Sequence, residues 1–434
     1  MSSPTEGTLE AIVVGGGFAG ARAARDLGDA GKSVLLLEAR ERLGGRCWTR
    51  PFAGRETRVE AGGTWISTDV HPFCAEEVER YGLELKVSHG GAVETRWSLG
   101  GELTDGFPLA GEDLYDLERV LFEIVAASHR VDPERPRDEQ DLADLDVSVA
   151  EFLDGLAPRP RVREFLLMWA GLGSGALASE WSVLTALSLI AAMGNSVYGW
   201  YGAVTDAFEI GAGGVVEKLV AESGAAVELG AEVTRIEQDG DSVTVTVRDG
   251  RSWSAPAAVV ATPLAVWPEI EFSPPLPADK LEPARRNHPG RMKKTWMVVA
   301  GIPENLYASA WGTEFVQMFP EAAEPDGLVT LGMCAPPSEL DPGDLEAATA
   351  AVQQLAPEGI VLATDFHDWA ADPFSRGGWY VPPPGVLSTH HSALGRPEGR
   401  LRFAGADLAV RWIGWIDGAL ETGARAAHEA LSDI

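Results

Sequence analysis

Cysteine is scarce in this sequence. The 434 residues include three cysteines, Cys47, Cys74 and Cys334, and their spacing matches neither a metal site nor a redox pair. We therefore expect no disulfide framework and no metal site. Such sparse cysteine is typical of a reducing compartment, which predicts a cytoplasmic protein.

Long apolar runs are lacking as well. The sequence contains no run of roughly eighteen apolar residues, the length that a membrane-spanning helix needs. Its start, MSSPTEGTLE, has neither the basic nor the apolar part of a signal peptide. We therefore expect no membrane partner.

Basic residues are few compared with acidic ones. Lysine and arginine total 35 against 65 aspartate and glutamate, which gives a formal net charge of −30 at pH 7. This balance cannot produce the positive field that binds nucleic acid, so we expect no such partner. It mildly favours cationic substrates such as amines, although salt screens the attraction beyond about 10 Å. Solubility or a salty habitat explains the same acidity.

A glycine-rich turn follows the first predicted strand, Ile12 to Val14. Gly15, Gly17 and Gly20 fit the pattern G-x-G-x-x-G, and a helix is predicted from there to Ala30. The first glycine makes a tight turn, the second lets a diphosphate approach the backbone, and the third lets the helix pack on the strand. The phosphates would lie at the helix N-terminus. A glycine-rich turn without a ligand is the alternative.

The next strand supports the nucleotide interpretation. Residues Ser33 to Leu37 (SVLLL) predict a strand buried on both faces, and Glu38 follows it, eighteen residues after Gly20. An acidic side chain at this point accepts hydrogen bonds from both ribose hydroxyls of an adenosine and repels a 2′-phosphate, which disfavours NADP.

The segment RLGGR follows closely. Gly44 and Gly45 let the chain pass near a bulky cofactor, while Arg42 and Arg46 offer charge-assisted donors to a diphosphate. The later segment EAGGTW adds a second glycine pair. A solvated basic turn is the alternative interpretation of RLGGR.

The periodicity of the remaining chain predicts an α/β protein with two interleaved domains. The cofactor domain comprises residues 1–75, 206–284 and 391–434. The second domain comprises 76–205, which is largely helical, and 285–390, which contains longer strands.

Three local features give further expectations. The charged, proline-bearing segment 132–146 predicts an exposed connection. Ser148 and Glu151 form a capping-box signature for the next helix. Trp200 and Tyr201 lie in a glycine-flanked loop, where they line a cavity or fill a core; we favour the core.

The motifs GGGFAG, LLLEA, RLGGR and EAGGTW together resemble the flavin-containing amine oxidase family. The segment FAGADLAVRWIGWIDGALETGARAA resembles the flavin-binding C-terminal part of that family. An amphipathic helix would explain its apolar spacing, but not the two glycines that bracket Trp415. The resemblance covers nearly the full length. It implies a Rossmann-like FAD domain and a mixed α+β substrate domain.

The resemblance also implies the cofactor contacts. The backbone of Val233 contacts adenine, and Asp407, where the family often has Glu, contacts the ribityl and phosphate region. Covalently flavinylated members carry a cysteine where this chain has Gly378, so we expect non-covalent FAD. The expected FAD-binding residues are Gly15, Gly17, Phe18, Ala19, Gly20, Glu38, Ala39, Arg40, Gly44, Gly45, Arg46, Gly62, Gly63, Thr64, Val233, Gly405, Asp407, Trp415 and Ile416.

Family members hold the amine between two aromatic faces beside the flavin. Trp415 matches one face and Trp379 the other, with Tyr380 as the alternative for the second. Such a cage fixes orientation, because hydride transfer needs reacting atoms within about 3.5 Å. Cation–π attraction would favour an ammonium by roughly 0.5–2 kcal/mol. A protonated amine lacks the lone pair that assists C–H cleavage, so we assign the cage to alignment.

The segment GRMKKTW resembles the one that carries the family's lysine, which holds a water against flavin N5. Lys294 is the match, and strand alternation places Lys293 on the opposite face. A lysine that faces an apolar pocket has a lowered pKa. Two exposed strand lysines are the alternative.

Further segments, DLADLD, FLL, HDW and ADP, resemble the bacterial hydroxynicotine and nicotine oxidases. The hydroxynicotine enzyme has an aromatic and an amide that holds the substrate ring where this chain has Gly171 and Leu172. Leu172 cannot donate such a hydrogen bond, which argues against a hydroxypyridine and favours a more apolar amine.

We therefore expect an FAD amine oxidase that takes a hydride from the α-carbon of a neutral small amine. The resulting imine hydrolyses, and O₂ is reduced to hydrogen peroxide. The alternatives are a dehydrogenase with a protein electron acceptor, a carbon–carbon desaturase and a non-catalytic flavin-binding subunit. A homodimer is one assembly that we consider.

Overall fold

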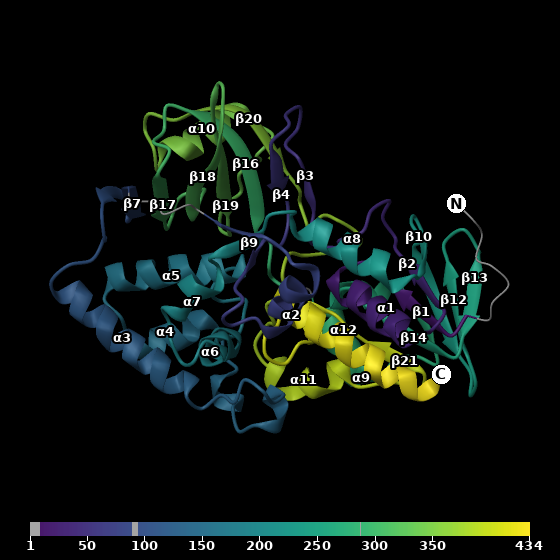
Figure 1. Ribbon diagram of the computed structural model, residues 1–434. Coiled ribbons are helices and arrows are strands. Elements are labelled where there is room, and N and C mark those ends of the chain that lie inside the picture. Colours follow the sequence, from purple (N-terminus) through teal and green to yellow (C-terminus); the bar gives the residue numbers. More distant parts are fainter. Residues whose placement is uncertain (1–8, 89–93, 287) are drawn as a thin grey trace.

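A five-stranded parallel sheet forms the centre of one half of the molecule (Figure 1). The computed structural model describes residues 9–88, 94–286 and 288–434. The sheet takes its strands from three separate stretches of the chain. In spatial order they are β10 (Ala226–Glu228), β2 (Val34–Leu37), β1 (Ala11–Val14), β14 (Ala257–Val260) and β21 (Leu401–Phe403).

Different layers cover the two faces of this sheet. In β1, Ala11 and Val13 belong to a core shared with helices, whereas Ile12 and Val14 belong to a core shared with a four-stranded sheet. Because successive side chains of a strand point to opposite faces, the buried strand β1 contributes residues to both cores. The helices are α1 (Phe18–Asp29), α8 (Ala212–Ser223) and α12 (Ile416–Ala430). The four strands are β13 (Ser252–Ala255), β12 (Val243–Val247), β11 (Val233–Gln238) and β15 (Glu271–Ser273).

A seven-stranded mixed sheet forms the upper part of the molecule in Figure 1, with α10 (Leu345–Gln353) beside it. Its central strands are antiparallel, whereas β7 and β17 pair in parallel. The order is β20 (Ile360–Phe366), β16 (Lys293–Ala300), β19 (Gly327–Cys334), β18 (Gln317–Glu324), β17 (Leu306–Ala310), β7 (Glu94–Leu99) and β8 (Glu102–Asp105).

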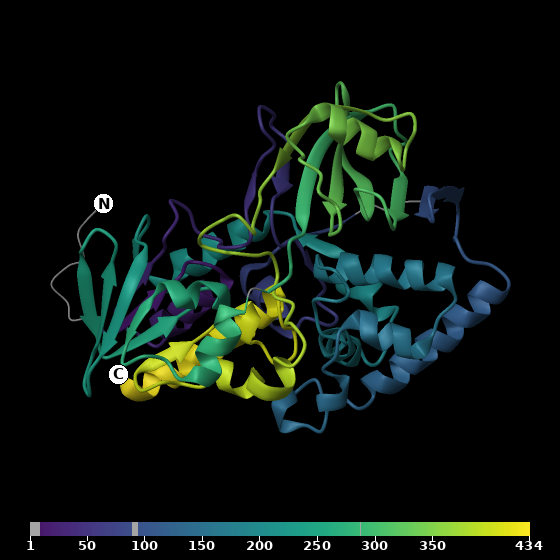
Figure 2. The same cartoon turned by 180° about the vertical axis from the view of Figure 1, so that it is seen from behind.

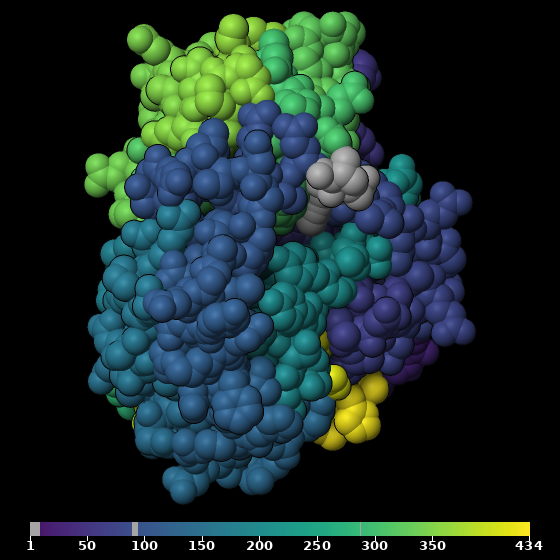
Figure 3. All heavy atoms as spheres, turned by 90° about the vertical axis from the view of Figure 1, so that its left-hand side faces the viewer, coloured from purple at the N-terminus to yellow at the C-terminus, as the bar shows by residue number. Residues whose placement is uncertain are grey.

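Helices below this sheet form the third part, and their stretch of the chain, coloured blue to teal, covers much of the lower part of the face in Figure 3. They are α3 (Glu112–Ser128), α4 (Val149–Leu156), α5 (Pro160–Ser174), α6 (Val183–Ala192) and α7 (Gly199–Ala203). The rear view shows α9 (Ala278–Arg285) and α11 (Leu387–Gly395) near α12 (Figure 2).

Shorter elements connect these parts. They are α2 (Pro72–Tyr81), the pair β3 (Thr49–Pro51) and β4 (Arg58–Glu60), the sheet of β5 (Trp65–Ile66), β9 (Asp206–Phe208) and β6 (Leu85–Val87), and the 3₁₀ helices η1 (Arg137–Glu139), η2 (Ala143–Leu145), η3 (Leu264–Glu269), η4 (Ala406–Leu408) and η5 (Leu431–Asp433). None of the helices in the described ranges is long and apolar enough to cross a membrane.

The predicted N-cap of α4 is confirmed, whereas the segment before α4 differs in part from the prediction. Ser148 caps α4, and its hydroxyl accepts a hydrogen bond from the Glu151 N–H at 3.1 Å. The prediction that residues 132–146 form an exposed connection holds for most of the segment, but Arg137, Leu142, Leu145 and Asp146 are buried. The Arg137 guanidinium donates to the carbonyl oxygen of Val410 and the hydroxyl of Ser188, at 2.9 and 2.8 Å. These hydrogen-bond acceptors offset the free-energy cost of burying the Arg137 charge.

Several strands carry no clear signal in the sequence. β17, β18 and β20 were not predicted, and the register of β18 shifts between Pro320 and Ala322. A proline and a bulge interrupt the alternation by which a strand is recognised. The residue boundaries of the two predicted domains stay a prediction.

A buried ion pair ties α2 to α1, the helix that follows the glycine turn. Both carboxylate oxygens of Glu77 accept hydrogen bonds from Arg25, at 2.8 and 3.1 Å, and both side chains are almost fully buried. We expect Glu77→Ala to lower the free energy of unfolding by about 3 kcal/mol, because it leaves a buried guanidinium without its main partner. The neighbouring exposed Glu76 provides the control, since Glu76→Ala should cost less than about 1 kcal/mol. Urea unfolding curves of both variants measure the difference, and equal losses would contradict the assignment.

Candidate active site

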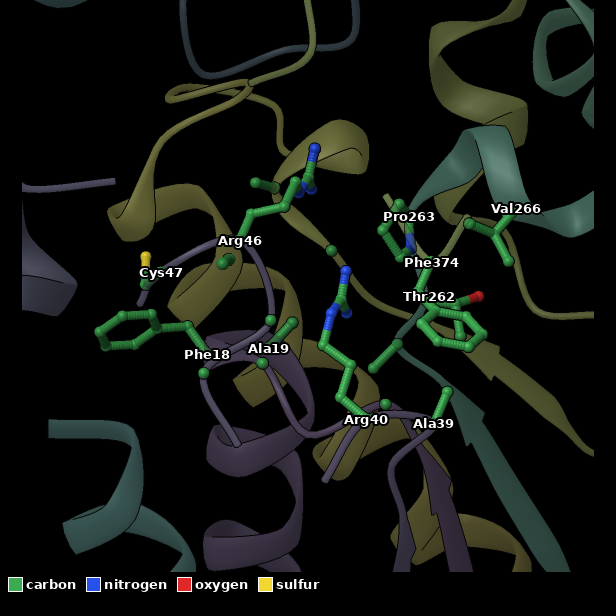
Figure 4. Close-up of a pocket in the computed structure, with 18 of the residues that line it drawn as sticks. Phe18, Ala19, Ala39, Arg40, Arg46, Cys47, Thr262, Pro263, Val266 and Phe374 are labelled. Atoms are coloured by element: carbon green, nitrogen blue, oxygen red, sulfur yellow. The ribbon is translucent and has the colours of Figure 1, made fainter. Parts of the chain in front are cut away.

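The carboxyl ends of three parallel strands meet at one edge of the sheet. Gly15 follows β1, Glu38 follows β2 and Thr262 lies just beyond β14, and all three line one cavity of about 340 Å³ (Figure 4). The carboxyl edge of an open parallel sheet is where nucleotides bind.

The glycine turn shapes the floor of this cavity, which we call the cofactor cavity. Gly15 has a φ of +109°, and a Cβ there would lie 2.7 Å from the carbonyl oxygen of Ala261. Gly17 is the N-cap of α1, and no side chain caps the helix. Phe18 and Ala19 line the cavity, so the first N–H groups of α1 are available to an anion. Gly20 lies behind the turn, against the carbonyl oxygen of Gly15, as its packing role requires.

Glu38 reaches the cavity from the end of β2. Its side chain is buried, and its two oxygens accept hydrogen bonds from the N–H groups of Gly16 and Arg40, at 2.7 and 2.9 Å. Each carboxylate oxygen has a further lone pair. The carboxylate is therefore fixed in place and can still accept a hydrogen bond from a ligand.

Arg46 joins distant parts of the site. It lines the cofactor cavity, and its guanidinium donates to the Asp407 carboxylate at 2.7 Å and to the Gly378 carbonyl oxygen at 2.9 Å. Asp407 also accepts from the N–H of Leu264 at 2.9 Å. The Asp407 carboxylate therefore holds Arg46 from behind the cavity wall.

Arg42 does not serve as a cavity donor. Its guanidinium donates to the carbonyl oxygens of Leu43 and Gly45, at 3.0 Å each, and lies over the ring of Trp48. The prediction that Arg42 faces a diphosphate is wrong, because its donors hold the loop that it belongs to. Arg40, in contrast, lines the cavity and donates to the Asp372 carboxylate at 2.8 Å.

Most of the expected cofactor residues meet around this one cavity. Gly20, Thr64 and Asp407 do not line it. Those that do are Gly15, Gly17, Phe18, Ala19, Glu38, Ala39, Arg40, Gly44, Gly45, Arg46, Gly62, Gly63, Val233, Gly405, Trp415 and Ile416.

Sequence reasoning missed part of the lining. Thr262, Pro263 and Val266 follow β14, and Phe374 and Arg376 come from the loop before Trp379 (Figure 4). The Thr-Pro pair after a buried strand is a usable signal, since strand ends form this edge. The loop residues carry none, because only the tertiary fold brings them here.

A second cavity of about 470 Å³ lies between the seven-stranded sheet and the helices, and we call it the substrate cavity. The two cavities share a wall. Its residues are Gly62, Gly63, Lys294, Trp379, Gly414, Trp415 and Ile416.

Trp379 and Trp415, the two residues predicted to form an aromatic cage, both lie in the shared wall, and the cage itself stays a prediction. The indole N–H of Trp379 donates to the Gly173 carbonyl oxygen at 3.0 Å. Trp415 is the N-cap of α12, and its ring meets that of Trp412 edge-on at 5.4 Å. Tyr380 lines only the substrate cavity. Burial raises the pKa of its hydroxyl, for which the described residues provide no hydrogen-bond partner.

Trp200 and Tyr201 form part of α7 and line the substrate cavity. The ring of Trp200 contacts Trp415 edge-on at 5.5 Å, and Tyr201 contacts Trp169 at 5.4 Å. The structure thus supports the cavity alternative over the core that we favoured, and a short helix replaces the expected loop. Aromatic composition alone does not distinguish a core from a cavity wall.

Lys294 is buried in the shared wall. Its ammonium donates to the Gly62 carbonyl oxygen at 2.8 Å and to the Thr64 hydroxyl at 2.5 Å, and lies 4.1 Å from the ring centre of Trp65. Burial lowers the pKa of Lys294 to about 8, although the charges of Glu60 and Glu321 oppose the shift. Lys293 lies on the opposite face of β16, 3.6 Å from Asp368.

A nucleotide-type cavity therefore shares a wall with a second, more apolar cavity, an arrangement that fits a cofactor-dependent enzyme. Residues 18–431 match the family model of the flavin containing amine oxidoreductases, and the chain belongs to this family. It therefore acts on amines with a flavin, in agreement with the resemblance seen in the sequence.

Named relatives span nearly the whole chain. It is 37% identical to (S)-6-hydroxynicotine oxidase of Paenarthrobacter nicotinovorans, over 97% of this chain and 99% of that protein. It is 32% identical to pseudooxynicotine dehydrogenase of a Pseudomonas species, over 98% of this chain and 86% of that protein.

Solved structures confirm the predicted fold class. Putrescine oxidase bound to putrescine superposes with a TM-score of 0.87 at 23% identity, over 98% of this chain and 99% of that one. Cyclohexylamine oxidase from Brevibacterium oxydans IH-35A gives the same TM-score, identity and coverage.

The hydrogen bonds of Lys294 lead to a pH-dependent expectation. The amine is protonated below its lowered pKa of about 8 and neutral above it, so the kcat profile should change near that pH. Thr64→Val removes an acceptor that stabilises the ammonium, and should move the transition to lower pH. Lys294→Met should abolish this pH transition and slow turnover, while the variant still binds flavin. Lys293→Met is the matched control, and an unchanged transition in Lys294→Met would contradict the role.

Proposed function

We propose that this chain is an oxidase of small, neutral, largely apolar amines that holds FAD without a covalent bond. The observation that carries the proposal is the wall shared by the two cavities, which contains Lys294, Trp379 and Trp415. A cofactor on one side and a substrate on the other would meet there.

The cofactor cavity fits a dinucleotide rather than a flavin mononucleotide. Glu38 and Val233 line one part of it and Trp379 another, while the uncapped start of α1 lies along the same cavity. We infer that Glu38 and Val233 hold the adenosine and that Arg46 and the α1 N–H groups hold the diphosphate.

Non-covalent binding is supported by the cysteines. Of the described residues that line the cofactor cavity, Cys47 alone is a cysteine. Burial raises the pKa of its thiol to about 12, and a protonated thiol is a poor nucleophile. Gly378, next to Trp379, has no side chain to form a bond.

Bound FAD would supply the hydride acceptor for the α-carbon of the amine and the route by which electrons reach O₂. The two tryptophan rings would orient the amine and exclude water at the shared wall. Lys294 lies in that wall, where it can hold or move a proton. The described lining of the substrate cavity contains no aspartate or glutamate to stabilise an ammonium, which supports a neutral substrate.

A dehydrogenase is the second candidate, because the relatives include proteins named as oxidases and as dehydrogenases. We further propose a cytoplasmic location, which the three free, buried cysteines support. A homodimer stays a prediction.

An anaerobic amine panel tests the proposal. We expect at least one apolar primary or secondary amine to bleach the visible band of the holoenzyme, and readmitted air to restore it with one hydrogen peroxide per flavin. Bleaching without reoxidation by air would favour the dehydrogenase. No bleaching by any amine would indicate a non-catalytic flavin-binding subunit.

Acid denaturation tests the binding mode. We expect all the flavin to appear in the supernatant as FAD, identified by chromatography, because no covalent bond holds it. Flavin that stays with the pellet would contradict this expectation. If Cys47→Ser then released it, Cys47 would be the attachment point.

A further inference from the structure

One wall of the substrate cavity is a row of side chains across the seven-stranded sheet. Lys294 on β16 pairs in register with Met333 on β19, and Met333 pairs with Gln317 on β18. Paired positions on neighbouring strands point to the same face, and all three side chains line the cavity. Because neighbouring strands lie about 4.8 Å apart, about 10 Å separates the backbone positions of Lys294 and Gln317.

The amide of Gln317 makes only some of its possible hydrogen bonds within the protein. Within the ranges that the structure describes, its side chain makes one hydrogen bond, which Nε2 donates to the hydroxyl of Tyr307. A primary amide carries two N–H donors and a carbonyl oxygen. One N–H and the carbonyl oxygen therefore remain for a ligand. Gln317 is 5% exposed, so an apolar ligand group that displaced water from this amide would leave it unsatisfied, whereas a polar group would pair with it.

The surrounding lining limits the charge of that ligand group. Lys294 is the one side chain with a formal charge among the described residues that line the substrate cavity. Glu321 accepts a hydrogen bond from Ser88 at 2.8 Å and does not itself line the cavity. A second ammonium, or a carboxylate beside Gln317, would be desolvated without an opposite charge.

We propose that Gln317 is a specificity-determining residue, which hydrogen-bonds an uncharged polar group at the end of the substrate remote from its reacting amine. The inference rests on the proposed function, which places that amine at the shared wall beside Lys294. The favoured substrate is a monoamine with a distal hydroxyl, carbonyl or ring nitrogen. Diamines and amino acids are disfavoured.

Binding of two alcohols that carry no amine tests Gln317 without turnover. Tyrosol and 2-phenylethanol differ by one distal hydroxyl, and calorimetry on the holoenzyme should show tyrosol binding about 3- to 10-fold more tightly, as one hydrogen bond predicts. Gln317→Met removes the amide at similar volume, and should make the two affinities equal. Gln317→Leu should do the same, in case one variant folds poorly.

The matched control is Gln353→Met. Gln353 lies at the end of α10, donates to the Gly359 carbonyl oxygen at 3.1 Å and does not line the cavity. It should keep the preference for tyrosol. Equal affinities in the unmodified enzyme, or a preference that survives in Gln317→Met, would overturn the proposal.

Turnover separates this inference from the proposed function. Tyramine and phenethylamine form the reactive version of the pair, and kcat/KM should favour tyramine by a similar factor that Gln317→Met removes. If amines bleach the flavin but Gln317→Met leaves their ranking unchanged, the proposed function stands and the role of Gln317 is wrong. If no amine reacts but tyrosol still binds preferentially through Gln317, the proposed function is wrong and the role of Gln317 stands.

Discussion

The hydrogen bonds of one guanidinium hold the site together. Arg46, in the loop after β2, binds the Asp407 carboxylate near the C-terminal helix and the carbonyl oxygen of Gly378 in the turn before Trp379. Three stretches that are far apart in sequence meet at this side chain. Because charge-assisted hydrogen bonds are short and directional, they fix the turn that carries one aromatic wall relative to the cofactor cavity. The position of the substrate cavity depends on the same contacts, since Trp379 lines both.

The charges inside the site are arranged differently from those of the chain as a whole. The formal net charge is −30, yet Arg40, Arg46 and the N-terminus of α1 place N–H donors around the cofactor cavity. An anionic cofactor can therefore be hydrogen-bonded locally although the overall charge opposes it. In the shared wall, burial of Lys294 makes its ammonium less favourable and lowers its pKa to about 8.

The sequence predicted those parts of the site whose residues lie close together along the chain. The turn from Gly15 to Gly20 and the strand that precedes Glu38 follow from spacing along the chain. Lys294 was identified from the resemblance of its segment to the amine oxidase family, and strand alternation placed Lys293 on the opposite face. Contacts set by tertiary packing were not predictable. Arg42 and Arg46 belong to the same pentapeptide, but only Arg46 turns toward the cavity, since Arg42 binds carbonyl oxygens of its own loop. Gln317 gave no signal either, because β18 contains a proline and a bulge.

The parallel sheet has a consequence for biosynthesis. Its strand order places β21, residues 401–403, beside β14, and the segment that follows β21 supplies Gly405, Trp415 and Ile416 to the cofactor cavity. A ribosome must therefore translate about four hundred codons before a flavin can be enclosed, since domains form from the N-terminus onward during synthesis. Until then β14 lacks its outer neighbour in the sheet, and α12 is not yet present to pack against α1.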